Sequence, residues 1–86
     1  MEAYFYRTAA GAEIDLILKI SSKELWAIEI KSGSTPQLTR GFHHACEDIK
    51  PNRKYVVYGG NDEFDIKHGV TVISLKNLML KLSDVA

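Results

Sequence analysis

Two neighbouring segments with an apolar residue at every second position constrain the fold of this chain most strongly. They are residues 13–20 and 25–31, and the polar residues 21–23 separate them. A period of two is typical of β-strands, because successive side chains point to opposite faces of a sheet. The two segments therefore predict an antiparallel hairpin with one apolar face, which carries Ile14, Leu16, Leu18, Ile20, Trp26, Ile28 and Ile30.

The register of this hairpin decides what its second face carries. Slipping the pairing by one residue would exchange the apolar and polar sets, so the parity of the register is nearly fixed. A longer loop of the same parity shifts the partners by two residues and leaves the same charged groups on that face. A loop of Ser21, Ser22 and Lys23 predicts the pairs Leu18–Trp26, Leu16–Ile28, Ile14–Ile30, Ile17–Ala27, Asp15–Glu29 and Glu13–Lys31.

Asp15 and Glu29 are like charges that this register sets opposite each other. Two carboxylates ~5 Å apart repel by roughly 3 kcal/mol at an effective dielectric near 20, so something should compensate. Lys31 offsets part of the repulsion, and a divalent cation such as Mg²⁺ or Mn²⁺ would offset more. Beside such an ion, Lys31 could help to activate water or stabilise charge on a phosphoryl group. The alternative is a polar strand face with a cross-strand ion pair.

The rest of the chain predicts three more strands and two helices. Residues 3–8, 54–58 and 70–73 favour strands, with polar loops between them, including residues 59–69. The period changes to that of a helix from Pro36, where Leu38, Phe42, Ala45 and Ile49 recur, and Pro51 ends this helix. Its N-cap is either Thr35, before Pro36, or Ser34 in a capping box with Gln37. A closing helix spans residues 75–82, with these side chains inward: Leu75, Leu78, Met79 and Leu82.

These elements follow one another in the order β-β-β-α-β-β-α. A strand, a helix and a strand joined by short connections form a right-handed crossover, so the strands of residues 25–31 and 54–58 should be parallel. The hairpin is antiparallel, and the sheet is therefore mixed. The expected class is α/β (α+β), in a single domain over residues 1–86.

Composition excludes several classes of protein. The 86 residues carry eleven basic and eleven acidic side chains, so an overall basic surface for nucleic acid is absent. Cys46 is the only cysteine and has no partner for an internal disulfide. No stretch resembles a secretory signal, and charged residues interrupt every apolar run before ~18 residues, so we expect a cytoplasmic chain without a membrane span.

The hairpin and the helix after it resemble the catalytic core of the PD-(D/E)XK nuclease superfamily, the restriction-endonuclease-like fold. The resemblance rests on Asp15, a gap of thirteen residues, and then Glu29-Ile30-Lys31 at the end of the next strand. A closer resemblance is to the uncharacterised C-terminal domain of many prokaryotic P-loop (AAA-type) ATPases. The segments that carry it are Phe5-Tyr6-Arg7-Thr8, Gly11-Ala12-Glu13-Ile14-Asp15, Ile28-Glu29-Ile30-Lys31-Ser32 and Gly69-Val70-Thr71-Val72-Ile73.

The resemblance implies that Asp15 and Glu29 bind metal and that Lys31 is catalytic. The superfamily has a helix before the first strand, whereas only residues 1–3 precede that strand here. No G-x-x-x-x-G-K-[ST] segment is present to bind a nucleotide. We therefore expect an excised domain or a truncated relative of a larger ATPase, with a sheet face or edge free for a protein partner or a homodimer.

Further residues are candidates for the surroundings of this site. Glu13 suits a supporting role beside the acids, and Arg7, Gln37 and Arg40 are candidates for phosphate contacts, although each is also common as an ordinary surface residue. Cys46 is expected in the core. The three histidines are expected to have no role in a site. His43 and His44 are adjacent on a helix, so their side chains point in different directions, and His68 lies in a loop at no spacing that suits a metal site.

Two functions of different classes follow. The first is a Mg²⁺- or Mn²⁺-dependent nuclease-like domain that hydrolyses DNA phosphodiester bonds, active or degenerate. The second is a non-catalytic DNA- or protein-binding module of a P-loop ATPase, in which the acids are inherited relics. The triad Asp15, Glu29 and Lys31 favours the first, and the neutral net charge with the missing first helix favours the second.

Overall fold

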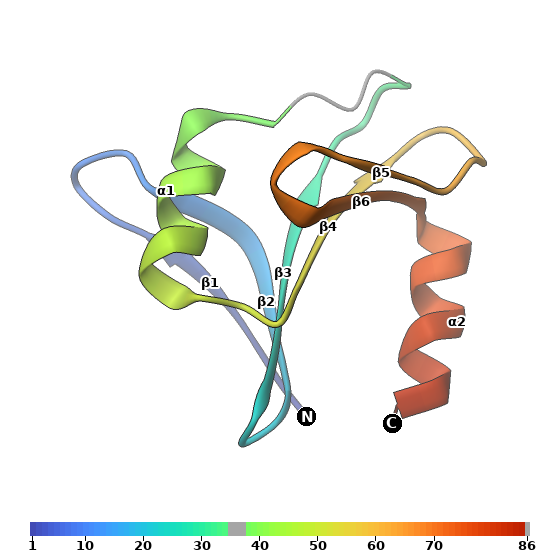
Figure 1. The fold of residues 1–86 in the computed structure, drawn as a ribbon, viewed down its shortest axis with the longest axis horizontal. Coiled ribbons are helices and arrows are strands. Elements are labelled where there is room, and N and C mark those ends of the chain that lie inside the picture. Colours follow the sequence, from blue (N-terminus) through green and yellow to red (C-terminus); the bar gives the residue numbers. More distant parts are fainter. Residues whose placement is uncertain (35–37, 86) are drawn as a thin grey trace.

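One twisted six-stranded sheet with an α-helix on each face makes up the described part of the chain (Figure 1). The computed structural model describes residues 1–34 and 38–85. The strands lie in the order β1-β2-β3-β4-β6-β5. In chain order the elements are β1 (Glu2–Arg7), β2 (Glu13–Ser21), β3 (Glu24–Ile30), α1 (Arg40–Ile49), β4 (Arg53–Tyr58), β5 (Phe64–Ile66), the 3-10 turn η1 (Lys67–Gly69), β6 (Val70–Ser74) and α2 (Leu75–Val85).

The sheet is mixed, as the sequence predicts. β1, β2 and β3 are antiparallel, whereas β3 pairs with β4, and β4 with β6, in parallel. The predicted α/β class and the parallel crossover through α1 are therefore confirmed. The prediction of a loop over residues 59–69 is wrong in part, because β5 lies there and pairs antiparallel with β6. Three residues are too few to show a hydrophobic period, so only the pairing with β6 reveals this strand.

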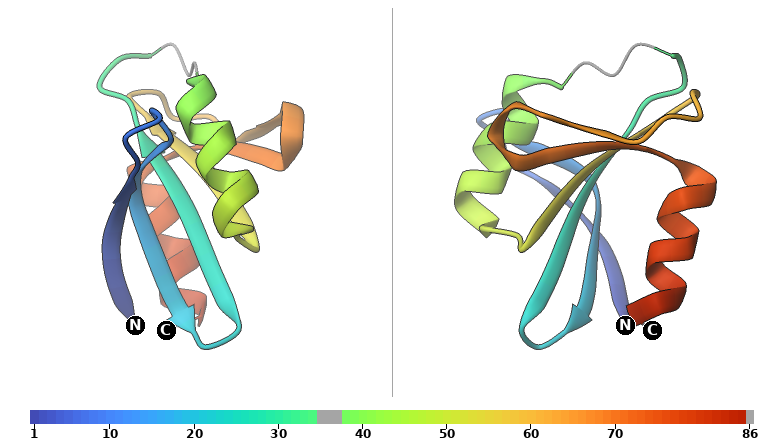
Figure 2. Two further views of the ribbon diagram at one scale, coloured as in Figure 1. Left: turned by 90° about the vertical axis from the view of Figure 1, so that its left-hand side faces the viewer. Right: turned by 45° about the vertical axis from the view of Figure 1, so that its right-hand side comes forward.

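Two apolar clusters fill the space between the sheet and its helices (Figure 2). Neighbouring strand residues alternate between them: Ala27 and Val56 face α1, whereas Trp26 and Tyr55 face α2. We call these sets the α1-face cluster and the α2-face cluster. The buried members of the first are Ala12, Ile14, Ile17, Ala27, Phe42, Ala45, Cys46, Val56, Tyr58, Val70 and Val72. Those of the second are Leu18, Trp26, Ile28, Tyr55, Val57, Ile73 and Leu78.

The predicted register of the hairpin is confirmed over its central part. Leu16 lies opposite Ile28, Ile17 opposite Ala27, and Leu18 opposite Trp26. Towards the turn the register shifts between Lys19 and Ser21, which pairs with Glu24. The connection between β2 and β3 is therefore Ser22–Lys23, shorter than the predicted loop of residues 21–23.

The opposite end of the hairpin differs from the prediction. β1 pairs Tyr4 with Ile17 but Tyr6 with Ile14, so β2 holds one residue more than β1 in this interval. Such a bulge reverses the alternation of side chains beyond it. Ile14 accordingly belongs to the α1-face cluster and not to the face of Leu16, and Ile30, predicted to pack opposite it, is 55% exposed.

The helix α1 starts later than the sequence predicts. Thr39 is its N-cap, and the Thr39 hydroxyl accepts a hydrogen bond from the Phe42 amide at 3.2 Å. The predicted cap Thr35 lies outside the described residues, and the prediction of Ser34 is wrong, because it lies five residues before Thr39. The end is as predicted: the helix stops before Pro51, and Lys50 adopts a left-handed conformation with φ of 54°.

Gly41 lets α1 approach the turn between β1 and β2. A Cβ atom at this position would lie 2.4 Å from the backbone oxygen of Gly11, which is far inside van der Waals contact. This close approach seats the first turn of α1 beside the start of β2, where Glu13 and Asp15 lie.

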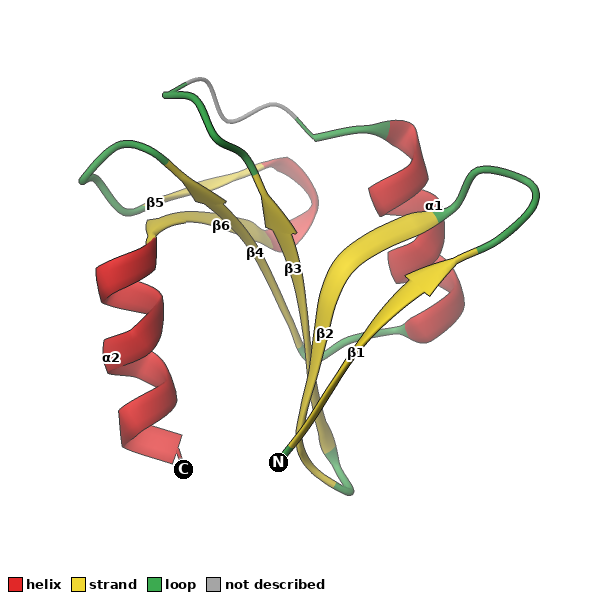
Figure 3. Cartoon of the chain, turned by 180° about the vertical axis from the view of Figure 1, so that it is seen from behind, coloured by secondary structure: helices red, strands yellow, loops and turns green. Residues whose placement is uncertain are grey.

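The inward face of α2 is narrower than predicted. Leu78 is buried and Leu82 is half-buried, but Leu75 and Met79 are 61% and 56% exposed, so the prediction is wrong for these two residues. The helix packs on β6 and β4 (Figure 3), and Leu78 shares its cluster with Leu18 of β2. Neither described helix is long and apolar enough to cross a membrane.

Candidate functional site

Asp15 and Glu29 meet where the β2–β3 hairpin ends, on the side of α1. Glu29 follows Ala27 on the α1 face of β3, and only 5% of its surface is exposed. Asp15 is exposed, and its Oδ2 accepts a hydrogen bond from the Ile30 amide at 2.9 Å. The two carboxyl groups interact, and each contributes to the shift of the other's pKa. We call these two residues the acid pair.

The bulge in β2 explains the position of Asp15. Regular pairing with β3 ends at Leu16 and Ile28, before Asp15 is reached. The Ile30 amide is thus bound by the side chain of Asp15. The predicted backbone opposition of Asp15 and Glu29 is therefore replaced by a contact between their side chains, at a point where bulges commonly redirect side chains.

Of the two carboxyl groups, that of Glu29 has the larger shift in pKa. Burial, the hydrogen bond with Asp15 and the charge of Asp15 raise the pKa of Glu29 to about 7, against a partial offset from Lys31. The negative charge of Glu13 acts in the same direction as that of Asp15. Near neutral pH, Glu29 therefore exchanges its proton readily and can donate it to Asp15 in a hydrogen bond.

The pKa of Asp15 is shifted in the opposite direction, to below its ordinary value. Its partial burial alone would raise its pKa, but the hydrogen bonds from Glu29 and from the Ile30 amide lower it below the ordinary value. The positive charges of Lys31 and Arg7 lower it further. Two adjacent carboxyl groups with opposite shifts are typical of sites where one holds a negative charge and the other exchanges a proton.

Lys31 supplies a cation directly beside the acid pair. Its Nζ lies 3.8 Å from Oε2 of Glu29, and 29% of its side chain is exposed. Its amide donates a hydrogen bond to the carbonyl of Val57 at 2.8 Å, which continues the pairing of β3 with β4 beyond Ile30. The three residues that the sequence singles out, Asp15, Glu29 and Lys31, are thus brought together.

Of the remaining predicted residues, two act on the acid pair through their charge. Arg7 and Glu13 form an exposed ion pair at 2.9 Å, and both act electrostatically on the acid pair. Arg40 begins α1, is exposed and takes part in no ion pair among the described residues. Gln37 lies outside the described residues.

The chemistry of the acid pair fits a hard divalent cation. Mg²⁺ prefers oxygen ligands and keeps several waters, so one or two protein carboxylates are the usual number. Within residues 1–34 and 38–85, no group of three or more His, Cys, Asp or Glu side chains is close enough for a metal cage. The acid pair thus offers two carboxyl groups as oxygen donors.

Two side chains differ from their predicted placement as isolated surface groups. His43 on α1 is half-buried, and its ring lies 4.9 Å from that of His68, centroid to centroid. Neither residue gives a sequence signal for this contact, because only the β5–β6 connection brings His68 to α1. His44 is exposed and Cys46 is buried, as predicted, and burial raises the pKa of the Cys46 thiol to about 11.

The chain is similar to two much longer mycobacterial proteins. Uncharacterized proteins of Mycobacterium bovis and Mycobacterium tuberculosis are each 30% identical to it over 76 residues, which is 88% of this chain and 17% of each relative. The chain thus spans about one sixth of the length of these relatives. No solved structure matches it.

A family comparison covers nearly all of the described residues. Residues 1–78 match one family, from β1 to the first half of α2, so the match includes Asp15, Glu29 and Lys31. The chain therefore belongs to the family described as "Domain of unknown function (DUF4143)".

Proposed function

We propose that this chain is a Mg²⁺- or Mn²⁺-dependent nuclease-like domain, related to the PD-(D/E)XK superfamily, that hydrolyses DNA phosphodiester bonds. One observation carries the proposal: a buried glutamate, Glu29, lies beside Asp15, whose carboxylate the Ile30 amide holds, and Lys31 lies 3.8 Å from Glu29. A structural ion pair needs one acid and one base. Two acids that share one lysine leave an excess of negative charge that a divalent ion would neutralise.

Each residue has a distinct part in the proposed reaction. Asp15 and Glu29 hold the ion, which when bound supplies Lewis-acid stabilisation of the phosphoryl group. The Ile30 amide fixes the orientation of the Asp15 carboxylate by a hydrogen bond. Lys31 offers its ammonium group to a phosphoryl oxygen and offsets the negative charge that develops there in the transition state. With its pKa near 7, Glu29 loses its proton readily when a cation binds.

A second candidate function is a non-catalytic DNA- or protein-binding module of a P-loop ATPase. The surface of β1 favours it: this edge strand exposes Phe5 by 71% and Tyr4 by 43%. An apolar edge strand is a common place for another chain to pair. A homodimer or a neighbouring part of a longer protein would cover it. For either function we propose a cytoplasmic setting, in which the buried thiol of Cys46 stays reduced.

DNA cleavage separates the two candidates. The 86-residue chain is incubated with supercoiled, single-stranded and branched DNA in Mn²⁺ or Mg²⁺. We expect nicking or cleavage of at least one substrate, and Lys31→Ala should lower the rate on the order of 100-fold, the effect of losing one group that stabilises transition-state charge.

Lys23→Ala is the matched control, because Lys23 is an exposed lysine at the other end of the same hairpin. This variant should cleave at the wild-type rate. Resistance of all three substrates would contradict the nuclease proposal and favour the binding module. Equal cleavage by the Lys31 and Lys23 variants would contradict the catalytic role of Lys31.

A further inference from the structure

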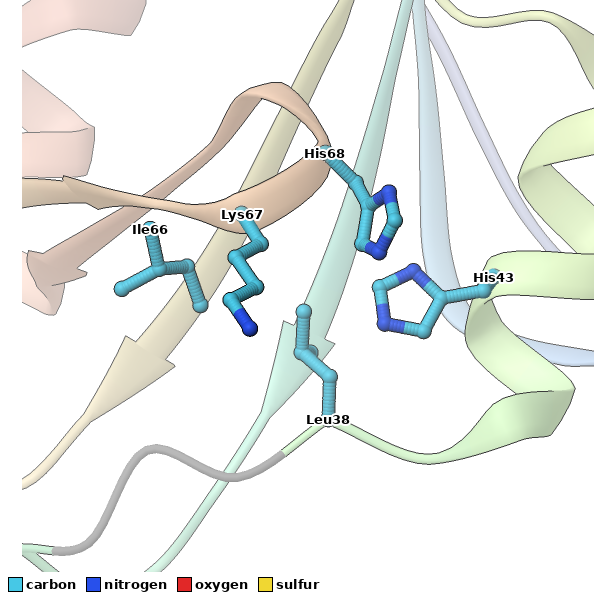
Figure 4. A pocket seen from close by; sticks show the side chains of 5 residues that line it. All are labelled: Leu38, His43, Ile66, Lys67 and His68. Atoms are coloured by element: carbon cyan, nitrogen blue, oxygen red, sulfur yellow. The ribbon is translucent and has the colours of Figure 1, made fainter.

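A second feature lies on the α1 face, separate from the acid pair. A pocket of about 270 Å³ opens between the start of α1 and the β5–β6 connection (Figure 4). Small-molecule sites commonly have volumes from about 300 Å³ upward, so this pocket suits a small group such as a single phosphate with part of its sugar. Its lining residues are Leu38, His43, Ile66, Lys67 and His68.

The polar side chains of this pocket are all bases. In Figure 4 a ring nitrogen of His43 and one of His68 face each other, and the amino group of Lys67 points into the same space. The two rings lie at 63° to each other. No carboxylate is among the lining residues. Imidazole N–H groups and an ammonium group that converge without an acid form a site for an anion, with several hydrogen-bond donors.

Lys54 adds a further positive charge behind the pocket. Its Nζ donates a hydrogen bond to the carbonyl of His68 at 2.9 Å. Burial is the largest cause that lowers the pKa of His43, and the charges of His68, Lys54 and His44 lower it further against the offset from Glu47.

The backbone of His68 is held in a conformation that directs its ring towards α1. Its φ of 66° and ψ of 26° lie in the left-handed region, which residues other than glycine seldom adopt. The bond from Lys54 fixes the adjoining carbonyl. Strained conformations of this kind persist where the surrounding structure determines them, and they gather at binding sites.

The pocket and the acid pair lie on the same face of the sheet, the one that α1 covers. Ala27 of β3 pairs with Lys54, and Lys54 pairs with Val70, the first residue of β6 after η1. The pocket therefore lies two strands from β3, and a nucleic-acid strand that crosses this face from the acid pair would carry a further phosphate towards His43 and His68.

We propose that this pocket binds a phosphate group of the nucleic-acid strand on which the acid pair acts, through His43, His68 and Lys67. The inference rests on the proposed function for the identity of the strand. Phosphate binding itself needs neither the divalent ion nor the acid pair, and it can be measured without them.

Imidazole resonances of the 86-residue chain provide the test, by ¹H–¹³C NMR in EDTA at a pH near 6.5. Inorganic phosphate is titrated first, followed by a 5′-phosphorylated dinucleotide. We expect saturable shifts for His43 and His68 but not for the exposed His44, with the dinucleotide binding more tightly than free phosphate. His68→Ala and Lys67→Ala should weaken binding at least tenfold, whereas His44→Ala and Lys23→Ala should leave it unchanged.

Several outcomes would overturn this proposal. Shifts that do not saturate, or that affect His44 equally, would show only general attraction of anions. A response of the two histidines to Zn²⁺ but not to phosphate would show a transition-metal site. If free phosphate binds more tightly than the dinucleotide, the pocket does not receive a strand.

The nuclease proposal and the phosphate-site proposal can fail independently of each other. Intact phosphate binding without metal-dependent cleavage would refute the nuclease and leave the phosphate site in place. Cleavage with no phosphate response at His43 and His68 would refute this pocket alone.

Discussion

Glu29 is the residue at which the account can be examined most closely, because a buried carboxyl group costs free energy when it is charged. Its side chain is 6% exposed, and its only cationic neighbour among the described ion pairs is Lys31. Asp15, next to it, competes for that same lysine. The site is therefore stabilised either by a proton on Glu29 or by a cation, and stability should depend on which of them is present.

Stability of the metal-free protein should fall as pH rises through neutrality. The pKa of Glu29 is raised from 4.5 to about 7 on folding, so the folded state binds more protons between these values. The contribution is fully present below pH 4.5 and is lost as pH rises through 7. Its size is roughly 3 kcal/mol, since one pKa unit corresponds to about 1.4 kcal/mol.

Thermal and urea unfolding from pH 5 to 9 in EDTA measure this effect. Glu29→Gln, which cannot ionise, should remove the fall and should be more stable than the wild type above pH 7. Asp15 has the opposite effect on the pH dependence of stability, because its pKa is lowered on folding. Its stabilising contribution is lost only as pH falls below the ordinary value of 3.8, outside the range of this experiment. A Glu29→Gln variant with the same pH profile as the wild type would show that Glu29 is not the group responsible.

At the scale of elements, the contact between α1 and the β1–β2 turn holds the hairpin end in place. Gly41→Ala would put a methyl group 2.4 Å from the Gly11 oxygen, and the obstructing atom is backbone. We expect a loss of about 1–3 kcal/mol, the usual cost of overpacking, despite the better helix propensity of alanine. Urea unfolding measures this cost.

Gly33→Ala is the control for that substitution, because a Cβ atom there meets no atom within 4 Å. Its effect should be within about 0.5 kcal/mol of zero. If both variants are equally stable, the close approach of α1 to the turn is not needed for the fold.

Much of this architecture could be predicted from the sequence, because period-two segments fix side-chain parity. The pairs Leu16–Ile28 and Leu18–Trp26 follow from that parity together with a short loop. The position of Ile14 could not be predicted, because a bulge depends on pairing with β1, which leaves no mark on the period. β5 is too short to have a period, and the exposure of Met79 depends on how much sheet α2 covers.

The candidate site was predictable to the same degree. The triad of Asp15, Glu29 and Lys31 follows from strand parity, and the three side chains do meet. The contact of His43 with His68 was not predictable, because it joins a helix to a loop on strands that are distant in the chain.

At the scale of the whole molecule, the domain presents one face with chemistry and another with exposed apolar surface. α1, the acid pair and the histidine pocket share the first face. Phe5 on the edge strand β1 and Leu75 and Met79 on α2 are exposed apolar side chains. This apolar surface is where the proposed binding module would contact a partner.

The central claim is that the acid pair binds a divalent cation, and the thermal midpoint in increasing Mn²⁺ at pH 8 tests it most directly. A ligand that binds only the folded state raises stability by about 2.7 kcal/mol at one hundred times its dissociation constant. The account predicts a saturable rise for the wild type and for the control Glu13→Gln, and no rise for Asp15→Asn or Glu29→Gln. A wild-type midpoint that stays constant up to millimolar Mn²⁺ would contradict it.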